Sequence, residues 1–410
     1  MSTATRRVAP TDGPRLTASA PRSRGARVGG AVLVALLPAL VALWVATTTF
    51  SGGTLVPWHP VMVDLGVYRE AGRAALSGAD FYALPGLPFL YPPFAALLAT
   101  LLAVLPATVV QVGWVLANVA ALLALLARFG LRGWALSLVA TAAVYFVEPV
   151  QQTLAFGQVG IVLVALVVID LVPSTTDPVG TDRRRTGVLT GIAAAIKLTP
   201  GLFAVYLFFA GRRRAAMVTI GSFLGAGALA TVFLSRASLA YWSRLAHGDT
   251  GLGHSVIYST NQSVMGSWLR VFGLGSSLGA LAVSGLVAVV GVVAAVLWHR
   301  RGEVRLAVCL GGVASLLASP VSWSHHFVWV VPLAVCLWTA NRLPAVLRCL
   351  GFVFVGWVVA APFKRLPNGA DVELTYTWGQ NLLDSVTLLL GVALLLVGLI
   401  AAARRPTATP

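Results

Sequence analysis

Long apolar runs separated by short polar connections extend over most of the chain. Residues 28–50 supply about 20 apolar side chains, enough for a membrane helix and more than the roughly 7–15 of a signal-peptide core. This run predicts a retained first membrane helix, preceded by an arginine-rich tail at 1–27 that is too polar to fold alone. Further runs that cross or nearly cross a bilayer are predicted at 108–127, 133–147, 158–173, 215–234, 276–298, 305–320, 326–340, 346–361 and 383–403.

Another apolar stretch, 187–210, is interrupted at its centre by Lys197-Leu198-Thr199-Pro200. A lysine and a proline at mid-depth are both costly on a lipid-facing helix, so we predict two short helices that meet at a break. The total is then about twelve membrane segments. Residues 92–106 are short and bounded by prolines, which leaves open whether they form a re-entrant hairpin or begin the second span.

The amino-acid composition indicates a membrane protein. Of 410 residues, 58% are hydrophobic and 10% are charged, against roughly 45–50% and 25% in soluble domains. Together with a mean hydropathy of +0.87, these values exclude an ordinary soluble enzyme. The three cysteines lie in or beside apolar runs without the spacing of a metal site or disulfide framework, so we expect them to pack as small apolar residues.

The net charge of +16 could indicate nucleic-acid binding, but its distribution favours a membrane topology. With the tail inside and the segments alternating, 21 of the 29 Lys and Arg residues fall on one side, which carries the whole +16 and leaves the other side neutral. Basic residues concentrate on the cytoplasmic side of membrane proteins. We therefore predict a multi-pass plasma-membrane protein with both termini in the cytoplasm, including a short tail at 406–410.

The predicted outer connections, 51–91, 235–275 and 362–381, are long and rich in aromatic and polar residues, so chemistry is expected on that face. Asp64 follows the first span by about a dozen residues and has apolar neighbours. A carboxylate in this position suits a general base acting on a sugar hydroxyl. It equally suits the N-cap of a helix beginning near Leu65, and the residues alone leave both readings open.

Other polar residues mark the outer ends of the apolar segments. Lys197 needs an anionic partner, for which a lipid phosphate is suitable, or it extends to the membrane interface. His325 and His326 are adjacent, so on a helix they point about 100° apart and would not chelate one metal. They either have a structural purpose or donate to a phosphate or sugar hydroxyl. No acidic cluster lies near Asp64, so no divalent metal is expected.

Six motifs occur in order between Asp64 and His326. They are Val63-Asp64-Leu65-Gly66-Val67-Tyr68, Tyr91-Pro92-Pro93-Phe94, Glu148-Pro149 with Phe156-Gly157-Gln158, Lys197-Leu198-Thr199-Pro200, Asn261-Gln262-Ser263 and Ser319-Pro320-Val321-Ser322-Trp323-Ser324-His325-His326. Together they resemble glycosyltransferase family 87, the polyprenyl-phosphate-mannose-dependent mannosyltransferases of actinobacteria, and within it the α-(1→2)-mannosyltransferases that elongate phosphatidylinositol mannosides.

The resemblance implies an all-α integral membrane protein, a polytopic GT-C type helix bundle of about 12 membrane segments with long outer loops. Residues 28–405 would form one transmembrane glycosyltransferase domain with its active site on the outer side. The implied donor substrate is polyprenyl-phosphate-mannose, and the implied acceptor is a phosphatidylinositol mannoside or related glycolipid. No cofactor, metal or nucleic acid is implied.

The resemblance also implies roles for individual residues. Asp64 matches the family's catalytic aspartate and would act as the base in an inverting α-(1→2) transfer. We predict that the departing phosphate is bound by Lys197, His325 and His326. Weaker candidates for substrate contacts are Tyr91, Glu148, Gln158 and Asn261.

A lipid or glycolipid transporter is the competing hypothesis, since such proteins also use about twelve helices, broken helices and charges within the membrane. Two features disfavour it. No internal repeat is visible, and the polar residues concentrate at one face instead of the midplane. Transfer of labelled mannose to an acceptor would distinguish the enzyme from the transporter.

Overall fold

The computed structural model describes residues 24–51, 54, 58–174, 185–249, 251, 253–340 and 342–404. Within these ranges the regular structure is helical, apart from one isolated bridge that pairs Asn261 with Trp323. The predicted all-α class is therefore confirmed. The tails predicted at 1–27 and 406–410 lie outside the described residues, except for 24–27 at the start of the first helix.

Six helices in the described part of the chain are long and apolar enough to cross a bilayer. Three of them are the helices α4 (Ala107–Arg128), α10 (Arg213–Phe233) and α17 (Trp378–Arg404), and a fourth is residues 29–48 of α1 (Arg24–Thr48). The other two combine a helix with a 3-10 turn, namely 274–300 with α13 (Ser277–Arg300) and 345–365 with α16 (Ala345–Ala360). A seventh span results if α5 (Gly133–Phe146) and α6 (Glu148–Phe156), which meet at a bend of 77°, are counted as one. Helix length thus does not confirm the predicted count of about twelve.

Several predicted segments form helices that are too short to cross a bilayer alone. At about 1.5 Å per residue, they reach roughly 12–23 Å, whereas the hydrocarbon layer is about 30 Å thick. They are α7 (Gly160–Leu171), α8 (Val188–Ile196), α9 (Leu202–Phe209), α14 (Val304–Ala318) and α15 (Val330–Thr339).

The break predicted within 187–210 is confirmed. Helix α8 ends at Ile196, Lys197 has an extended backbone (φ −147°, ψ 130°), and a 3-10 turn at Thr199–Gly201 leads into α9. Pro200 has no N–H to continue the hydrogen-bonding pattern of α8. The lysine therefore lies at a helix break instead of on a lipid-facing helix surface.

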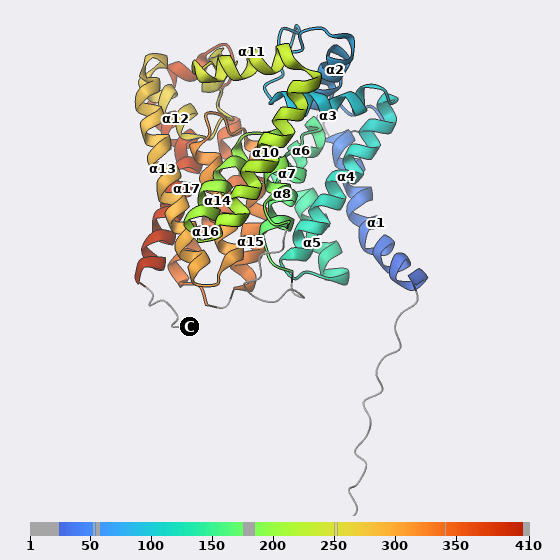
Figure 1. The fold of residues 1–410 in the computed structure, drawn as a ribbon. Coiled ribbons are helices and arrows are strands. Elements are labelled where there is room, and N and C mark those ends of the chain that lie inside the picture. Colours follow the sequence, from blue (N-terminus) through green and yellow to red (C-terminus); the bar gives the residue numbers. More distant parts are fainter. Residues whose placement is uncertain are drawn as a thin grey trace, which may run out of the picture.

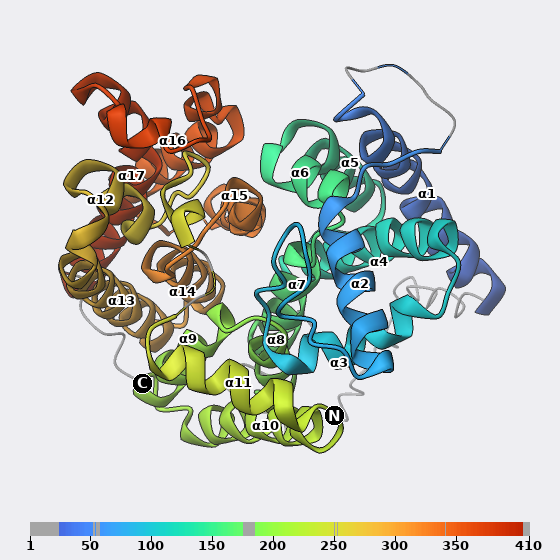
Figure 2. The same ribbon diagram turned by 90° about the horizontal axis from the view of Figure 1, so that it is seen from above.

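The connections predicted as outer loops contain helices of their own. These are α2 (Val63–Ser77), α11 (Ser235–Ala246) and α12 (Val264–Phe272). Residues 92–106 contain α3 (Pro93–Ala103), an 11-residue helix that packs along α2 and is not a full span. Helices α2, α3 and α11 lie across one end of the bundle, while α1 begins and α17 ends at the opposite end (Figures 1 and 2).

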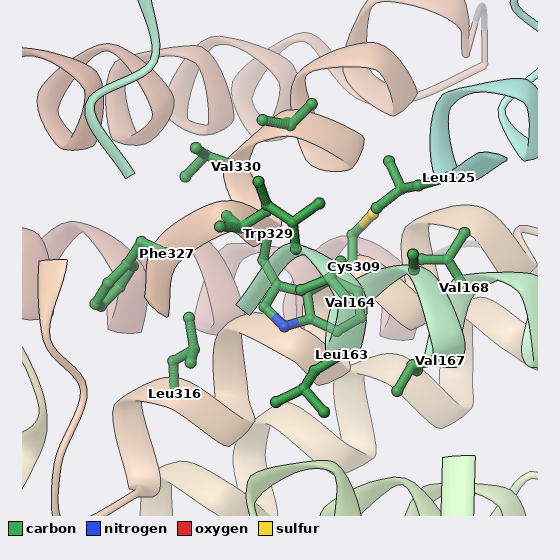
Figure 3. Packing of buried hydrophobic residues seen from close by; sticks show 14 of the residues in the cluster. Leu125, Leu163, Val164, Val167, Val168, Cys309, Leu316, Phe327, Trp329 and Val330 are labelled. Atoms are coloured by element: carbon green, nitrogen blue, oxygen red, sulfur yellow. The ribbon is translucent and has the colours of Figure 1, made fainter. Parts of the chain in front are cut away.

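Part of the apolar core lies where α7, α14 and the 3-10 helix η4 (Ser324–Trp329) meet (Figure 3). The indole of Trp329 stacks on Phe203, with 5.6 Å between ring centroids. A Cβ on Gly312 would lie 2.2 Å from that indole, so glycine is needed for the close approach. This packing fixes η4, which carries the two adjacent histidines.

Candidate active site

A cavity of about 280 Å³ lies at the end of the bundle where α2 and α11 are found. Its size is close to the lower end of the ~300–1,000 Å³ of small-ligand sites. The polar side chains that line it are Asp64, Tyr68, Tyr82, Tyr91, Gln158, Lys197, Thr199, Tyr241, Arg244, Asp249, Ser319, Trp323 and His326. The fold thus brings together five of the eight residues predicted for the site.

Asp64 is half-buried in the first turn of α2. The N-cap position belongs to Met62, so the reading of Asp64 as a helix N-cap is wrong. Burial raises the pKa of the Asp64 carboxyl from its ordinary 3.8 to about 6, while a hydrogen bond with Gln158 and the charge of Lys197 lower the pKa by less. Near pH 7 the group is therefore mostly ionised, yet basic enough to accept a proton.

A glycine lets the first turn of α2 approach the end of α6. Gly157 has φ 70°, and a Cβ there would lie 2.6 Å from the Cβ of Leu65 and 3.3 Å from that of Met62. The Met62 backbone N–H donates to the Ala155 carbonyl oxygen at 3.0 Å. Glycine alone combines this backbone conformation with this contact. The contact places Asp64 beside the residue that follows Gly157.

That residue, Gln158, organises the floor of the site. Its Oε1 accepts hydrogen bonds from the Tyr68 and Tyr91 hydroxyls at 2.9 and 3.0 Å, and the two hydroxyls lie 2.8 Å apart. Because Oε1 is occupied by the phenols, the amide NH₂ is left to donate to Asp64. The network therefore orients the carboxylate.

Lys197 and His326 supply the nitrogen donors of the cavity. Lys197 Nζ lies 2.6 Å from His326 Nε2 and 5.4 Å from the centroid of the Tyr91 ring. His326 Nδ1 accepts the backbone N–H of Trp323 at 3.1 Å, which assigns the proton of a neutral imidazole to Nε2. The Nε2–H then donates to Lys197 Nζ across the 2.6 Å contact, and the N–H groups of Lys197 are available to an anion in the cavity.

Three predicted site residues do not line this cavity. The ring of His325 packs on Phe156, with 5.5 Å between centroids. Glu148 forms an ion pair with Lys364 and also accepts a hydrogen bond from a residue of η4. Asn261 is buried and its side chain donates to two backbone carbonyls. All three contact the segment 319–326, or belong to it, and so hold in place the stretch that carries His326.

Several cavity residues were not predicted as site residues. Arg244 on α11 lies over the ring of Tyr82, with 4.7 Å from Cζ to the centroid, and Tyr82 stacks on Tyr241 at 5.6 Å and 23°. Trp323 and Tyr68 also line the cavity, although both stand inside the motifs. The aromatic character of 51–91 and 235–275 was the available signal, but it does not show which rings meet.

The fold and the cavity define a polytopic membrane protein with a carboxylate, a lysine and a histidine gathered at one end of its helix bundle. The sequence profile of Glycosyltransferase family 87 matches residues 89–320. The chain belongs to this family, and the resemblance seen in its motifs is confirmed. It is accordingly a glycosyltransferase.

Individual relatives agree with this assignment. The polyprenol-phosphate-mannose-dependent alpha-(1-2)-phosphatidylinositol mannoside mannosyltransferase of Mycobacterium tuberculosis is 31% identical over 87% of this chain and 88% of its own. The protein of the same name from Mycolicibacterium smegmatis is 28% identical over 88% and 90%. A phosphatidylinositol pentamannoside mannosyltransferase of the latter organism is 31% identical over 74% and 75%. No solved structure matches the chain significantly.

Proposed function

We propose that this protein transfers mannose from polyprenyl-phosphate-mannose to a phosphatidylinositol mannoside or related glycolipid and forms an α-(1→2) linkage. The names of the relatives describe this donor, linkage and acceptor. The observation that carries the proposal is that Asp64, Gln158 and Lys197 line the same cavity and interact there. The reaction needs a base and a cation within reach of one sugar ring, and these residues supply both.

Asp64 is the general base in the proposed reaction. It takes the proton of the acceptor hydroxyl while the oxygen of that hydroxyl attacks the anomeric carbon of the donor mannose. The bond between that carbon and the phosphate oxygen breaks, and polyprenyl phosphate leaves with the electron pair. A single displacement inverts the anomeric centre, so a β-mannosyl phosphate yields an α-mannoside.

Lys197 and His326 bind the phosphate in this scheme. As the bond to the anomeric carbon breaks, negative charge grows on the phosphate oxygens, and donors already in place stabilise it. The 2.6 Å contact between Nζ and Nε2 brings both groups to one point of the cavity, where a phosphate that replaces this hydrogen bond can accept an N–H from each. His325 is predicted to act through the position of its neighbour, because its ring packs on Phe156 outside the cavity lining.

We place the cavity on the outer face of the plasma membrane, with both termini in the cytoplasm. Four helix ends that carry arginine lie at the end of the bundle opposite α2 and α11, namely those at Arg128, Arg213, Arg300 and Arg404 (Figure 1). Basic residues mark the cytoplasmic side. We further propose a GT-C type bundle, in which the short helices complete about twelve membrane segments.

The alternative, a lipid transporter, receives no support from the relatives, since all three proteins described above are named as mannosyltransferases. The test is incubation of the purified protein with polyprenyl-phosphate-[¹⁴C]mannose and a series of phosphatidylinositol mannosides. We expect a labelled, longer glycolipid whose new linkage is cleaved by an α-(1→2)-mannosidase. Uptake of the labelled donor into vesicles without any transfer would contradict the proposal.

A further inference from the structure

The cavity contains a second cation that the transfer step described above does not use. Arg244, on α11, is half-buried and its guanidinium lies over the ring of Tyr82 at 4.7 Å. Tyr82 is itself held by a hydrogen bond from its hydroxyl to the Tyr91 carbonyl oxygen at 2.9 Å and by stacking on Tyr241. The arginine is thus fixed by a cation–π contact, which leaves its N–H groups available.

No described residue neutralises this arginine. In the part of the chain that the structure describes, no carboxylate forms an ion pair with Arg244, and its guanidinium makes no hydrogen bond to protein. Asp249 lines the same cavity, but its carboxylate accepts the Gly251 backbone N–H at 2.8 Å. A preorganised guanidinium of this kind is typical of phosphate recognition.

Arg244 and Lys197 are connected by a row of aromatic rings. Going from Arg244 to Lys197, the rings are those of Tyr82, Phe89 and Tyr91, with 6.0 and 5.6 Å between successive centroids. The two cations therefore lie at the two ends of an aromatic wall, where Arg244 contacts the ring of Tyr82 and Lys197 contacts the ring of Tyr91. A sugar headgroup along this wall would have a cation at either end.

The position of α11 indicates which lipid supplies the anion. This helix lies across the end of the bundle, nearly perpendicular to the long helices (Figures 1 and 2). Leu239 on it is 69% exposed, and Tyr241 and Trp242 are its aromatic residues. Exposed apolar side chains with Tyr and Trp are typical of the membrane interface, the depth at which lipid phosphates lie.

We propose that Arg244 binds the phosphodiester of the glycolipid acceptor, and so forms an acceptor subsite distinct from the donor-phosphate site at Lys197 and His326. This inference rests on the proposed function, because the donor carries one phosphate and that phosphate is assigned to Lys197. The acceptor, a phosphatidyl lipid, then brings the second anion. Arg244 fixes the distance of the acceptor sugar from Asp64 by holding the lipid phosphate at the interface.

The experiment measures initial rates in nanodiscs for the wild type, Arg244→Gln and Arg244→Lys, with each substrate varied in turn. Two acceptors are compared, a phosphatidylinositol mannoside and an alkyl mannoside of the same glycan that has no phosphate. Charge-assisted hydrogen bonds are each worth roughly 1.5–3 kcal/mol, so Arg244→Gln should raise KM for the phosphorylated acceptor about 10- to 150-fold. The KM for the donor, the KM for the alkyl mannoside and kcat at saturating acceptor should stay within about twofold of the wild type.

Arg236 supplies the matched control. It is an exposed arginine of the same helix that does not line the cavity, so Arg236→Gln should leave both KM values unchanged. Arg244→Lys should give an intermediate KM, since a lysine keeps the charge but not the planar fork of donors.

Three results would overturn the inference. They are an increase in donor KM, an equal increase for both acceptors, or no change in any KM. Each of these results is a KM measured on a variant that still transfers mannose. Failure of the proposed function is a separate outcome, in which the wild type itself transfers no mannose from polyprenyl-phosphate-mannose.

Discussion

Replacement of Asp64 by asparagine tests the assignment of the base directly. The change keeps the size of the side chain and the contact with Gln158, but removes the group that accepts a proton. General-base catalysis contributes about 10²–10⁴-fold, so kcat of Asp64→Asn should fall by at least about a hundredfold. The protein should remain folded, because the first turn of α2 is held by Gly157 and by the Met62 backbone.

The pH dependence of the wild type gives a second, independent magnitude. With a pKa of about 6, Asp64 is about 0.9 ionised at pH 7 and about 0.1 ionised at pH 5. The value of kcat/KM should therefore fall about tenfold between pH 7 and pH 5. The residual kcat/KM of Asp64→Asn should not show this fall between pH 7 and pH 5. The assay is transfer of labelled mannose in detergent buffers of constant ionic strength.

The same substitution should also change stability, with a sign set by the raised pKa. Ionisation costs the folded state free energy above pH 3.8, because the folded state holds the proton more tightly than the unfolded chain. A shift from 3.8 to about 6 corresponds to up to about 3 kcal/mol at pH 7. Asp64→Asn should accordingly raise the thermal midpoint at pH 7, and this gain should shrink as the pH falls toward 3.8.

The control is Glu70→Gln, which removes an exposed carboxylate from the same helix outside the cavity lining and should leave all three readouts unchanged. The reasoning would be refuted if Asp64→Asn kept more than about a tenth of wild-type kcat. A wild-type profile that stays flat from pH 7 to pH 5 would refute the pKa argument in particular.

Three further predictions concern the phosphate-binding side chains, the contact of α2 with Gly157 and a buried ion pair outside the cavity lining. Lys197→Ala should raise the KM for the donor at least tenfold and leave the KM for the acceptor unchanged. His326→Gln should raise the donor KM by a smaller factor. Equal effects on the KM values of both substrates would argue against a phosphate role for these residues. Gly157→Ala should lower kcat at least tenfold by displacing α2, with little loss of protein yield, as shown by comparing rates at equal amounts of folded enzyme. Arg270→Leu should destabilise the fold by about 3–5 kcal/mol, because it removes the guanidinium whose Nε lies 2.5 Å from Oδ2 of the buried Asp384. Replacement of both residues by leucine should recover most of the loss in thermal midpoint.

The sequence predicted the helical class and the main breaks well. Hydrophobicity accumulates over 20 residues, so α1, α10, α13 and α17 were located to within a few residues. The break at Lys197 was predictable because a charge and a proline both disfavour a lipid-facing helix. The number of full spans was not, because α7, α14 and α15 are apolar yet short, and a short helix stays in the bundle only through its neighbours.

The membership of the site was predicted less completely. His325 and His326 are adjacent and chemically identical, yet His326 lines the cavity and His325 packs on Phe156. The 3-10 geometry of η4 and the stacking of Trp329 decide which ring faces inward, and neither is visible in residue types. Arg244 was missed for a similar reason, since its contact with Tyr82 joins two outer segments that are remote in the chain.

The order and kind of the residues were enough to identify a membrane protein and to relate its motifs to one family. Hydrophobicity is a sum over neighbouring residues and a motif is a short fixed sequence, so neither depends on how the chain packs. The tertiary structure alone decided which motifs share a cavity, because Lys197 and His326 are 129 residues apart and meet at 2.6 Å only after the bundle has closed. It also set the pKa of Asp64 near 6, since the cost of desolvating a carboxylate depends on what surrounds it in space.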